Sequence, residues 1–414
     1  MKFSATFALF VFLSSMFCFA EDTTPEQSLV IQDIQCKGNT KTDCSYISSY
    51  LYLSLGDAVN EEEIQNAKLR LSSIPNFSTV DIYLEKGTER GHAKVIIEVT
   101  EANPITKEVA LGISREPYGW GLKQKIAGRI SHQNLYGTGK ILELEANGQF
   151  SNEKESYRNG TVAKVKFQAL SSRLQYIDPS LFGSKKYYLI AGLKYDNYLS
   201  ASDRLSYDMV EFYRIDLSIG RRFGDFSYIT LGYSHIPLIK SQWKDTITGI
   251  TQVNRSINFA HNLRVNYGWN NEDDAYFPTQ GSRFNFGMGW RDRGNAFFMD
   301  NLAYQNTWRG DDTSIWTFKL GGTPNGNFRS TLDESQGLSL SYAKAIKSNS
   351  IFGDIEKGRW FIEPGMYGIG YSSSLGTVID PGLKAGIRLQ TKAFGIVDIY
   401  ALGSTTLRVG GHNQ

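Results

Sequence analysis

Residues 134–150 read NLYGTGKILELEANGQF, and their pattern is repeated through most of the chain. The stretch opens with a turn that holds two glycines. Apolar residues from Leu142 to Phe150 then alternate with polar residues from Glu143 to Gln149. Side chains on a β-strand point to opposite faces with a period of two, so this strand has one apolar and one polar face. A half-buried strand of a soluble protein has the same pattern.

The alternation recurs about every 15 to 25 residues from Ile105 to the end of the chain, as in an up-and-down barrel. The clearest further examples are residues 163–169, 213–219, 263–269, 284–290 and 383–389. We therefore predict an all-β barrel of about sixteen antiparallel strands, an even number as in bacterial barrels.

The two faces of such a barrel admit two environments. In a soluble β protein the charges face water, whereas in a membrane barrel the apolar face meets lipid and the charges line a wet interior. Aromatic residues make up 13% of the chain, and many stand at strand ends, where bilayer interfaces hold ring belts. They include Tyr187, Tyr188, Tyr195, Tyr198, Trp290, Trp308, Trp360, Tyr367 and Tyr371. This favours the membrane barrel.

The first twenty residues have the features of an export signal. Lys2 supplies a positive start, residues 7–19 an apolar core, and Ala20 a small residue before the expected cut. After Ala20 no run approaches the ~20 apolar residues that a membrane helix needs. The formal net charge of +2 gives no basic surface for nucleic acid.

Residues 28–101 have the pattern of a separate small α/β domain. The expected order is strand, helix, helix, strand, strand (βααββ). Gly38-Asn39 is a tight turn after the first strand, Ile47, Leu51 and Leu55 are spaced as on a helix, and Asn60 with Glu63 resembles a capping box.

Specific motifs of this domain resemble a POTRA (polypeptide-transport-associated) domain. They are Ile31-x-x-Ile34-x-Cys36-x-Gly38-Asn39, Leu55-Gly56-Asp57, Phe77-x-x-Val80 and Ile97-x-Val99. Residues 134–140, 177–183, 276–281 and 361–365 are similar to the barrel of the same group. The group is the bacterial surface antigen superfamily of POTRA-plus-barrel outer-membrane proteins, which includes barrel-assembly proteins and two-partner-secretion transporters.

The resemblance implies a signal peptide at 1–20, a periplasmic POTRA domain at 28–101 and a barrel at 105–414 in the outer membrane of a Gram-negative-type cell. It implies a protein that assists insertion or export of polypeptides, with an unfolded client, outer-membrane lipid and periplasmic accessory proteins as partners. The POTRA sheet edge would bind the client by strand addition. A passive pore, with the POTRA domain as a docking scaffold, is the alternative function.

The chain departs from this superfamily at two places. The loop near Phe328-Arg329 lacks the Val-Arg-Gly-aromatic motif of the loop that folds into the lumen. The last residues, 408–414, also lack a terminal aromatic residue. No enzyme motif is evident, because the five histidines are scattered and neither a phosphate-binding loop nor a nucleophile elbow is present. We therefore expect no catalysis, cofactor or metal.

Three sets of residues are candidates for structural or gating roles. Cys36 and Cys44 form an even pair in an exported domain, so we expect a disulfide, with two free thiols as the alternative. By resemblance, Glu363 faces the lumen and pairs with Arg329 or Arg388; a hydrated glutamate is the alternative.

The third set is a seam between the first and last strands, since no strand edge can be left in lipid. We expect residues 106–114 to pair with residues 405–410, with Leu111 near Leu407. The glycines after Val409 suggest a weak seam that opens sideways.

Overall fold

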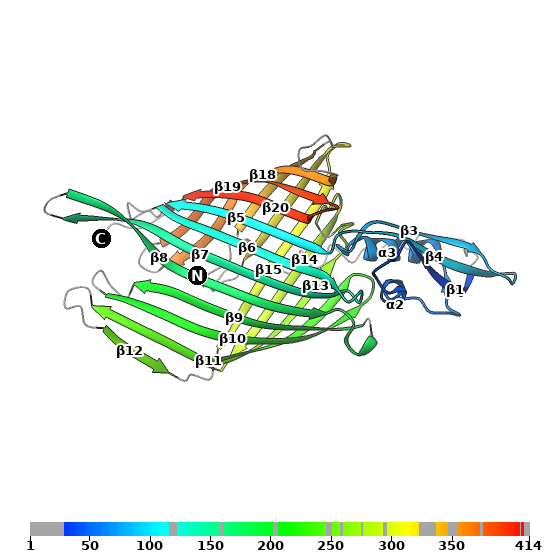
Figure 1. The fold of residues 1–414 in the computed structure, drawn as a ribbon, viewed down its shortest axis with the longest axis horizontal. Helices are drawn as coiled ribbons and strands as arrows, with labels where there is room; N and C mark the ends of the chain where they lie inside the picture. Colours follow the sequence, from blue (N-terminus) through cyan, green and yellow to red (C-terminus); the bar gives the residue numbers. More distant parts are fainter. Residues whose placement is uncertain are drawn as a thin grey trace, which may run out of the picture.

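A small N-terminal domain and a large closed barrel make up the molecule (Figure 1). The computed structural model describes residues 29–115, 122–157, 160–184, 186–201, 206–245, 251–256, 260–274, 276–292, 296–322, 337–346, 355–372, 376–405 and 407–409. The expected signal peptide, Arg329 and the loop around it, and residues 410–414 lie outside this part of the chain.

The N-terminal domain contains a four-stranded sheet with strand order β2-β1-β4-β3. Strands β1 and β4 pair in parallel, and the other pairs are antiparallel. The elements are β1 (Leu29–Lys37), α2 (Cys44–Ser48), β2 (Ala58–Val59), α3 (Glu61–Ser72), β3 (Phe77–Lys86) and β4 (His92–Glu101). Alternate residues of β4, including Val95 and Ile97, form one buried core with Ile47 of α2 and Leu71 of α3. The predicted strand–helix–helix–strand–strand order holds, with the short β2 added.

The two helices differ in how well the sequence predicts them. Asn60 and Glu63 form the expected capping box, in which each side chain accepts a hydrogen bond from the other residue's backbone amide. The expected helix from Ile47 to Leu55 is wrong, because α2 ends at Ser48. Tyr52 has a positive φ of 59°, which no α-helix accommodates.

The barrel begins at Ile105, directly after the N-terminal domain. The strands are β5 (Ile105–Arg115), β6 (Leu122–Leu135), β7 (Lys140–Tyr157), β8 (Gly160–Asp178), β9 (Tyr187–Ala201), β10 (Ser206–Phe223), β11 (Ser227–Asp245), β12 (Thr251–Ser256), β13 (Ala260–Asn270), β14 (Gly281–Arg291), β15 (Ala296–Arg309), β16 (Ser314–Gly322), β17 (Gly337–Ala345), β18 (Ile355–Ser372), β19 (Gly376–Thr391), β20 (Gly395–Thr405) and β21 (Leu407–Val409). A single 3-10 turn, η1 (Leu181–Gly183), lies between β8 and β9.

The described strands occupy fifteen positions around the barrel. Strands β12 and β13 share the flank of β11, and β20 and β21 share the flank of β19. The all-β barrel is as expected, but its strand count is fifteen instead of about sixteen. Because an odd number of up-and-down strands cannot close in an antiparallel way, β5 and β20 pair in parallel.

The two faces of the barrel wall differ in the way that the alternation predicts for a membrane barrel. Leu142 and Leu144 of β7 point outward and are 42% and 50% exposed. Glu145, the residue after Leu144, points inward and is 3% exposed. Outward leucine, isoleucine and valine side chains recur on β5, β6, β8, β10, β11 and β13. An apolar exterior around a charged interior is the arrangement of a transmembrane barrel. No helix in the described part of the chain is long and apolar enough to cross a membrane.

Candidate functional site

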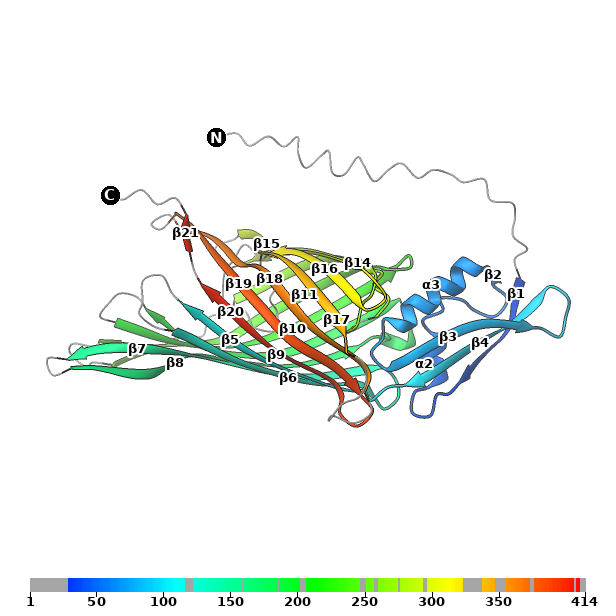
Figure 2. The same cartoon turned by 90° about the horizontal axis from the view of Figure 1, so that it is seen from above.

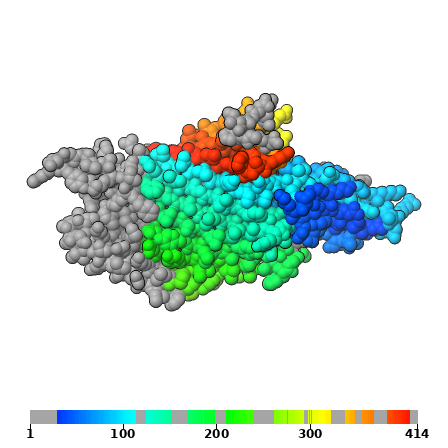
Figure 3. All heavy atoms as spheres, viewed as in Figure 1, coloured from blue at the N-terminus to red at the C-terminus, as the bar shows by residue number. Residues whose placement is uncertain are grey.

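The N-terminal domain lies at one end of the barrel, against the strand-connecting turns at that end (Figures 1 and 2). We call this end the domain end. Its described turns include those of β6–β7, β8–β9, β10–β11, β13–β14, β15–β16 and β19–β20. Strand β21 lies at the opposite end (Figure 2). The space-filling view shows the domain packed directly against the barrel (Figure 3).

The loop at residues 38–43 docks on the β6–β7 turn, which lies within residues 134–150. The Asp43 amide donates a hydrogen bond to Gly137 O at 3.0 Å, and Asn134 Nδ2 donates to Thr42 Oγ1 at 2.8 Å. A Cβ on Gly137 would lie 2.2 Å from Lys41 O, so this approach requires glycine. Gly137 also has a φ of +75°. The turn is therefore a docking surface as well as a strand connection.

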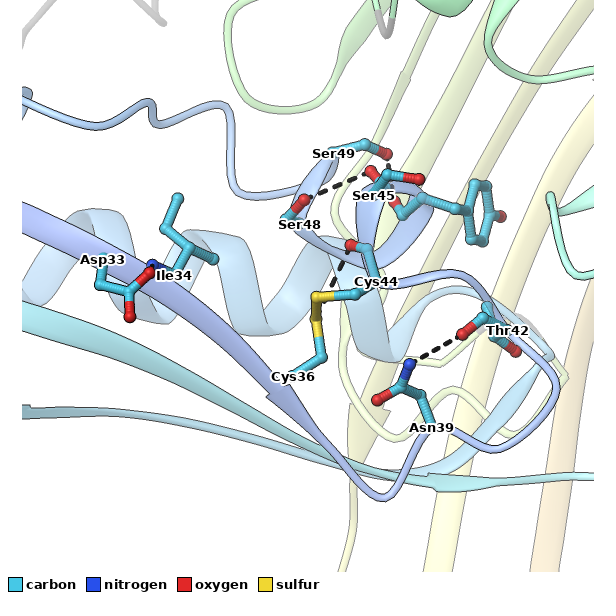
Figure 4. The surroundings of a disulfide bond; sticks show 10 residues. Asp33, Ile34, Cys36, Asn39, Thr42, Cys44, Ser45, Ser48 and Ser49 are labelled. Atoms are coloured by element: carbon cyan, nitrogen blue, oxygen red, sulfur yellow. Dashed lines mark hydrogen bonds between the residues drawn. A yellow bond between two sulfur atoms is a disulfide. The ribbon is translucent and has the colours of Figure 1, made fainter.

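The expected turn residues and cysteines shape this docking loop. Gly38 has a φ of +82°, and a Cβ there would lie 2.0 Å from Val99 O. Asn39 Nδ2 donates to Thr42 O at 2.9 Å. A disulfide joins Cys36, near the end of β1, to Cys44 at the start of α2, with 5.7 Å between their Cα atoms (Figure 4). The bond holds the two ends of the loop together, at β1 and α2 of the N-terminal domain.

Glu101, at the end of β4, holds the same loop from the other side. Its carboxylate accepts hydrogen bonds from Thr40 Oγ1 at 2.6 Å and from the amides of Lys41 and Thr42 at 3.0 and 2.7 Å. Burial acts to raise the pKa of Glu101, but these hydrogen bonds outweigh it and lower the pKa to about 2. Glu101 therefore stays ionised and keeps the loop in its docked shape.

A second contact ties α3 to the β10–β11 turn. Arg70 is buried and donates to Asp225 Oδ1 at 2.6 Å and to the carbonyls of Tyr50 and Leu51 at 2.8 and 2.7 Å. Asn66 Nδ2 also donates to Asp225, at 3.1 Å. Because Arg70 is held by its own domain, it offers Asp225 a positioned charge.

A cleft of about 620 Å³ lies between the N-terminal domain and the other side of the barrel mouth. The start of β3, residues 77–80, forms its domain wall, and β3 is an edge strand of the sheet. The barrel wall comes from the β13–β14 and β15–β16 turns and from the ends of β17 and β18. An edge strand with an adjoining cleft has the geometry that strand addition needs.

Glu363 of β18 points into the lumen and is 3% exposed. Its partners are Lys319 Nζ of β16 at 2.7 Å and Ser339 Oγ of β17 at 2.9 Å. The expected pairing with Arg388 is wrong. The register places Glu363 beside Lys384, while Arg388 lies opposite Arg359 and pairs with Asp398, whose Oδ2 is 2.8 Å from Arg388 Nε. The other candidate partner, Arg329, lies outside the described residues.

The expected seam between Leu111 and Leu407 is also wrong. Strand β5 pairs with β20 over ten residue pairs, and Leu111 faces Ala401. Leu407 lies opposite Ile379 of β19 instead. At the domain end, Asn103 Nδ2 adds hydrogen bonds to the carbonyls of the β19–β20 turn, at 3.1 and 3.2 Å. The seam is therefore longer and better held than the glycine-rich last residues suggest.

The β13–β14 turn, described at residues 271–274 and 276–280, borders the lumen and is held there by two arginines. Arg388 Nη1 donates to Tyr276 O at 2.7 Å, and Arg359 Nη1 donates to Pro278 O at 2.8 Å. Arg359 also donates to Phe277 O, and its guanidinium lies 5.3 Å from the Phe277 ring centre. Phe277 is 3% exposed. Above this turn the lumen contains a cavity of about 450 Å³.

Sequence reasoning missed the roles of Arg70, Glu101 and Arg359. The sequence marks residues 134–140 and 276–281 as similar to the superfamily, and both segments prove to be contact points. Their partners are distant in the chain and have no motif of their own. Within the described residues, no group of three or more His, Cys, Asp or Glu side chains is placed to hold a metal.

Comparison with known proteins adds information on the fold. No protein-family model and no curated protein sequence matches the chain. Similar solved structures include CdiB from Escherichia coli (12% identity, 88% of this chain and 70% of that chain, TM-score 0.50) and CdiB from Acinetobacter baumannii (12%, 88% and 68%, 0.49). BamA from Haemophilus ducreyi lacking POTRA domains 1–3 is also similar (12%, 93% and 82%, 0.44). At this identity the likeness to E. coli CdiB supports the fold alone, which agrees with the POTRA-plus-barrel architecture expected from the sequence motifs.

Proposed function

We propose that this protein is an outer-membrane barrel that assists the insertion or export of polypeptides, with its POTRA-like domain in the periplasm. The observation that carries the proposal is the cleft at the barrel mouth, which is lined by the start of the edge strand β3. An extended client paired with β3 would lie beside the entrance to the lumen. The apolar barrel exterior supports placement in a membrane, and the superfamily resemblance of the sequence supports the polypeptide client.

Two routes lead onward from this cleft. Sideways release into lipid requires the seam to open, which breaks the ten-pair contact between β5 and β20. Passage through the lumen leaves the barrel wall intact and, among the described segments, requires the β13–β14 turn to move. The second route therefore disrupts fewer described contacts. No nucleotide is at hand in the periplasm, so client folding must supply the free energy.

Photo-crosslinking tests the proposal directly. A photo-crosslinking amino acid replaces Thr79, an exposed residue of β3 in the cleft, in the full-length protein in liposomes. The control carries it at Ala58, an exposed residue of β2 at the opposite edge of the sheet. The probe is a synthetic peptide of about ten alternating apolar and polar residues, the length of a membrane strand. We expect adducts at Thr79 and few at Ala58, whereas equal yields or none would overturn strand addition at β3.

The alternative function, a passive pore, is favoured by the continuous seam and the charged lumen wall. A passive pore would give a steady ion conductance in planar bilayers and no preferential adduct at Thr79. A client-handling barrel would give the adduct, and its conductance would change when the probe peptide is added.

A further inference from the structure

We propose that the β13–β14 turn is a gate between the cleft and the lumen, and that Arg359 and Arg388 hold it shut. The inference rests on the proposed function for its purpose, since it defines how a client in the cleft would reach the lumen. Its structural basis is independent of any client.

The turn separates two cavities. One set of its residues lines the cleft beside β3, and another lines the cavity of the lumen. The cleft side consists of Asp273, Asp274, Phe277 and Thr279, and the lumen side of Tyr276 and Pro278. Arg359 lines both cavities. Displacing this one turn would therefore join the cleft to the lumen.

The bonds that hold residues 276–278 come from side chains on β18 and β19 and lie outside the strand pairing of the barrel wall. Three consecutive carbonyls, of Tyr276, Phe277 and Pro278, accept hydrogen bonds from Arg388 and Arg359. Lys357 adds an ion pair with Asp274 at 2.6 Å. The strand pairing of β13 with β14 ends at Asn270 and Arg283, so release of the turn breaks none of those ladder pairs.

The turn also has internal bonds that let it move as one body. Asp274 Oδ1 accepts hydrogen bonds from the Tyr276 and Phe277 amides, both at 2.9 Å. Asp273 Oδ1 accepts from the amide of Thr279 at 2.7 Å. These bonds do not involve the arginines, so the turn keeps its shape when the latch opens.

The latch chemistry matches an extended polypeptide. The guanidinium groups of Arg359 and Arg388 bind backbone carbonyl groups, and an incoming chain has the same acceptors along its whole length. A client can therefore exchange with the turn at the arginines without leaving their donors unsatisfied. This exchange would make opening depend on the client.

Planar-bilayer recording of the full-length protein without any client tests the gate. Arg359→Gln removes both arginine bonds to Phe277 and Pro278. Arg173→Gln is the matched control, because Arg173 also lies in the barrel interior and its described partners are Glu143 and Glu145, at 3.2 and 3.0 Å, which lie outside the turn. We expect Arg359→Gln to raise the open fraction of the pore about tenfold or more, from the loss of two charge-assisted bonds. The control should conduct like the wild type.

A locked variant keeps the test decisive if Arg359→Gln folds poorly, which heat-modifiability on gels would reveal. Cysteines at Asp274 and Lys357, joined by a short bifunctional maleimide, should hold the turn shut and suppress opening, and the same protein before cross-linking should open more often. Equal conductance of wild type, Arg359→Gln and the locked form would overturn the gate even if client adducts form at Thr79. Gating without such adducts would leave the gate standing and overturn the proposed function.

Discussion

At the residue scale, single side chains set how the N-terminal domain and the lumen are held. Gly137 has room for no side chain, because the Lys41 carbonyl occupies the place of its Cβ. Glu363 is almost completely buried in the lumen and is satisfied by one lysine and one serine. In both cases the neighbouring groups determine what the position tolerates.

Gly137→Ala should undock the N-terminal domain from the β6–β7 turn. The left-handed conformation costs an alanine roughly 1–2 kcal/mol, and the new methyl group also collides with Lys41 O. Gly183→Ala is the control, since Gly183 has a φ of +72° but no atom within 4 Å of its Cβ position. Hydrogen exchange of the Asp43 amide should accelerate in Gly137→Ala and stay unchanged in Gly183→Ala. Equal exchange rates would contradict the docking role.

Lys319→Gln should destabilise the barrel more than the double change Lys319→Gln with Glu363→Gln. The single change leaves the buried carboxylate with Ser339 as its described hydrogen-bond partner and Lys384 as the neighbouring charge. We expect a loss toward the lower end of about 3–5 kcal/mol in a lumen that admits water. The double change removes the unpaired charge as well. Unfolding temperatures from heat-modifiability on gels report the order, and a double variant as unstable as the single one would argue against the pair.

At the element scale, the loop at residues 38–43 is held by three separate restraints. The disulfide closes its ends, Glu101 binds its backbone, and the β6–β7 turn receives it. Each restraint comes from a different element, so loosening any one of them should weaken the contact between the loop and the barrel.

The Cys36–Cys44 bond should stabilise the N-terminal domain by about 2 to 3 kcal/mol in the chain-entropy model, because it closes a short loop. Thiol labelling of the unreduced mature protein should find no free cysteine. Replacement of both cysteines by serine should lower the unfolding temperature of the domain and leave that of the barrel unchanged. Detection of two reactive thiols in the unreduced protein would contradict the prediction of a disulfide.

Acid should loosen the docking loop through Glu101. The folded-state pKa of about 2 lies below the ordinary glutamate value, so the stabilisation is fully present above that ordinary value, about 4.3. It is lost as the pH falls from there toward 2. Hydrogen exchange of residues 38–44, corrected for intrinsic rates, should show protection falling in this window. Glu101→Gln should have weaker protection that does not change there, and a wild type equally flat would refute the role of Glu101.

At the scale of the whole molecule, the parallel contact of β5 with β20 closes the barrel. Ten residue pairs and the Asn103 bonds to the neighbouring turn hold this closure. Lateral release of a client into lipid would have to break this closure. Passage through the lumen would leave it intact and would need the β13–β14 turn to move.

Paired cysteines should locate the seam and show whether it must open. Leu111→Cys with Ala401→Cys lie directly opposite in the register and should form a disulfide under mild oxidation. The control pair, Leu111→Cys with Leu407→Cys, should not form a disulfide, because Leu407 is six residues beyond Ala401 in the chain. The locked protein should still form client adducts at Thr79 and pass client through the lumen. Loss of transport that returns on reduction would favour lateral opening instead.

The sequence predicts the architecture better than the contacts, for physical reasons. Alternation reports which face of a strand is apolar, so the barrel wall and the inward position of Glu363 follow from it. Ion-pair partners depend on register between strands: on β19, a shift of four residues places Lys384 instead of Arg388 opposite Glu363. Lys319 reaches Glu363 from β16, which is two strands away. The pairing of β5 with β20 in place of residues 405–410 depends on the number of strands that fill the wall, which no local pattern records.

Among the described residues, the contacts that fasten the N-terminal domain lie at the β6–β7 and β10–β11 turns, while the cleft opens on the side of the β13–β14 turn. Mechanically this makes the domain a lever whose fulcrum is the two fastened turns. If a client binds β3 as proposed, tension in that client would act on the other side of these turns and would rotate the domain about them, which would change the width of the entrance. A chain that is being pulled outward would in this way regulate its own passage, without any fuel beyond the pull itself.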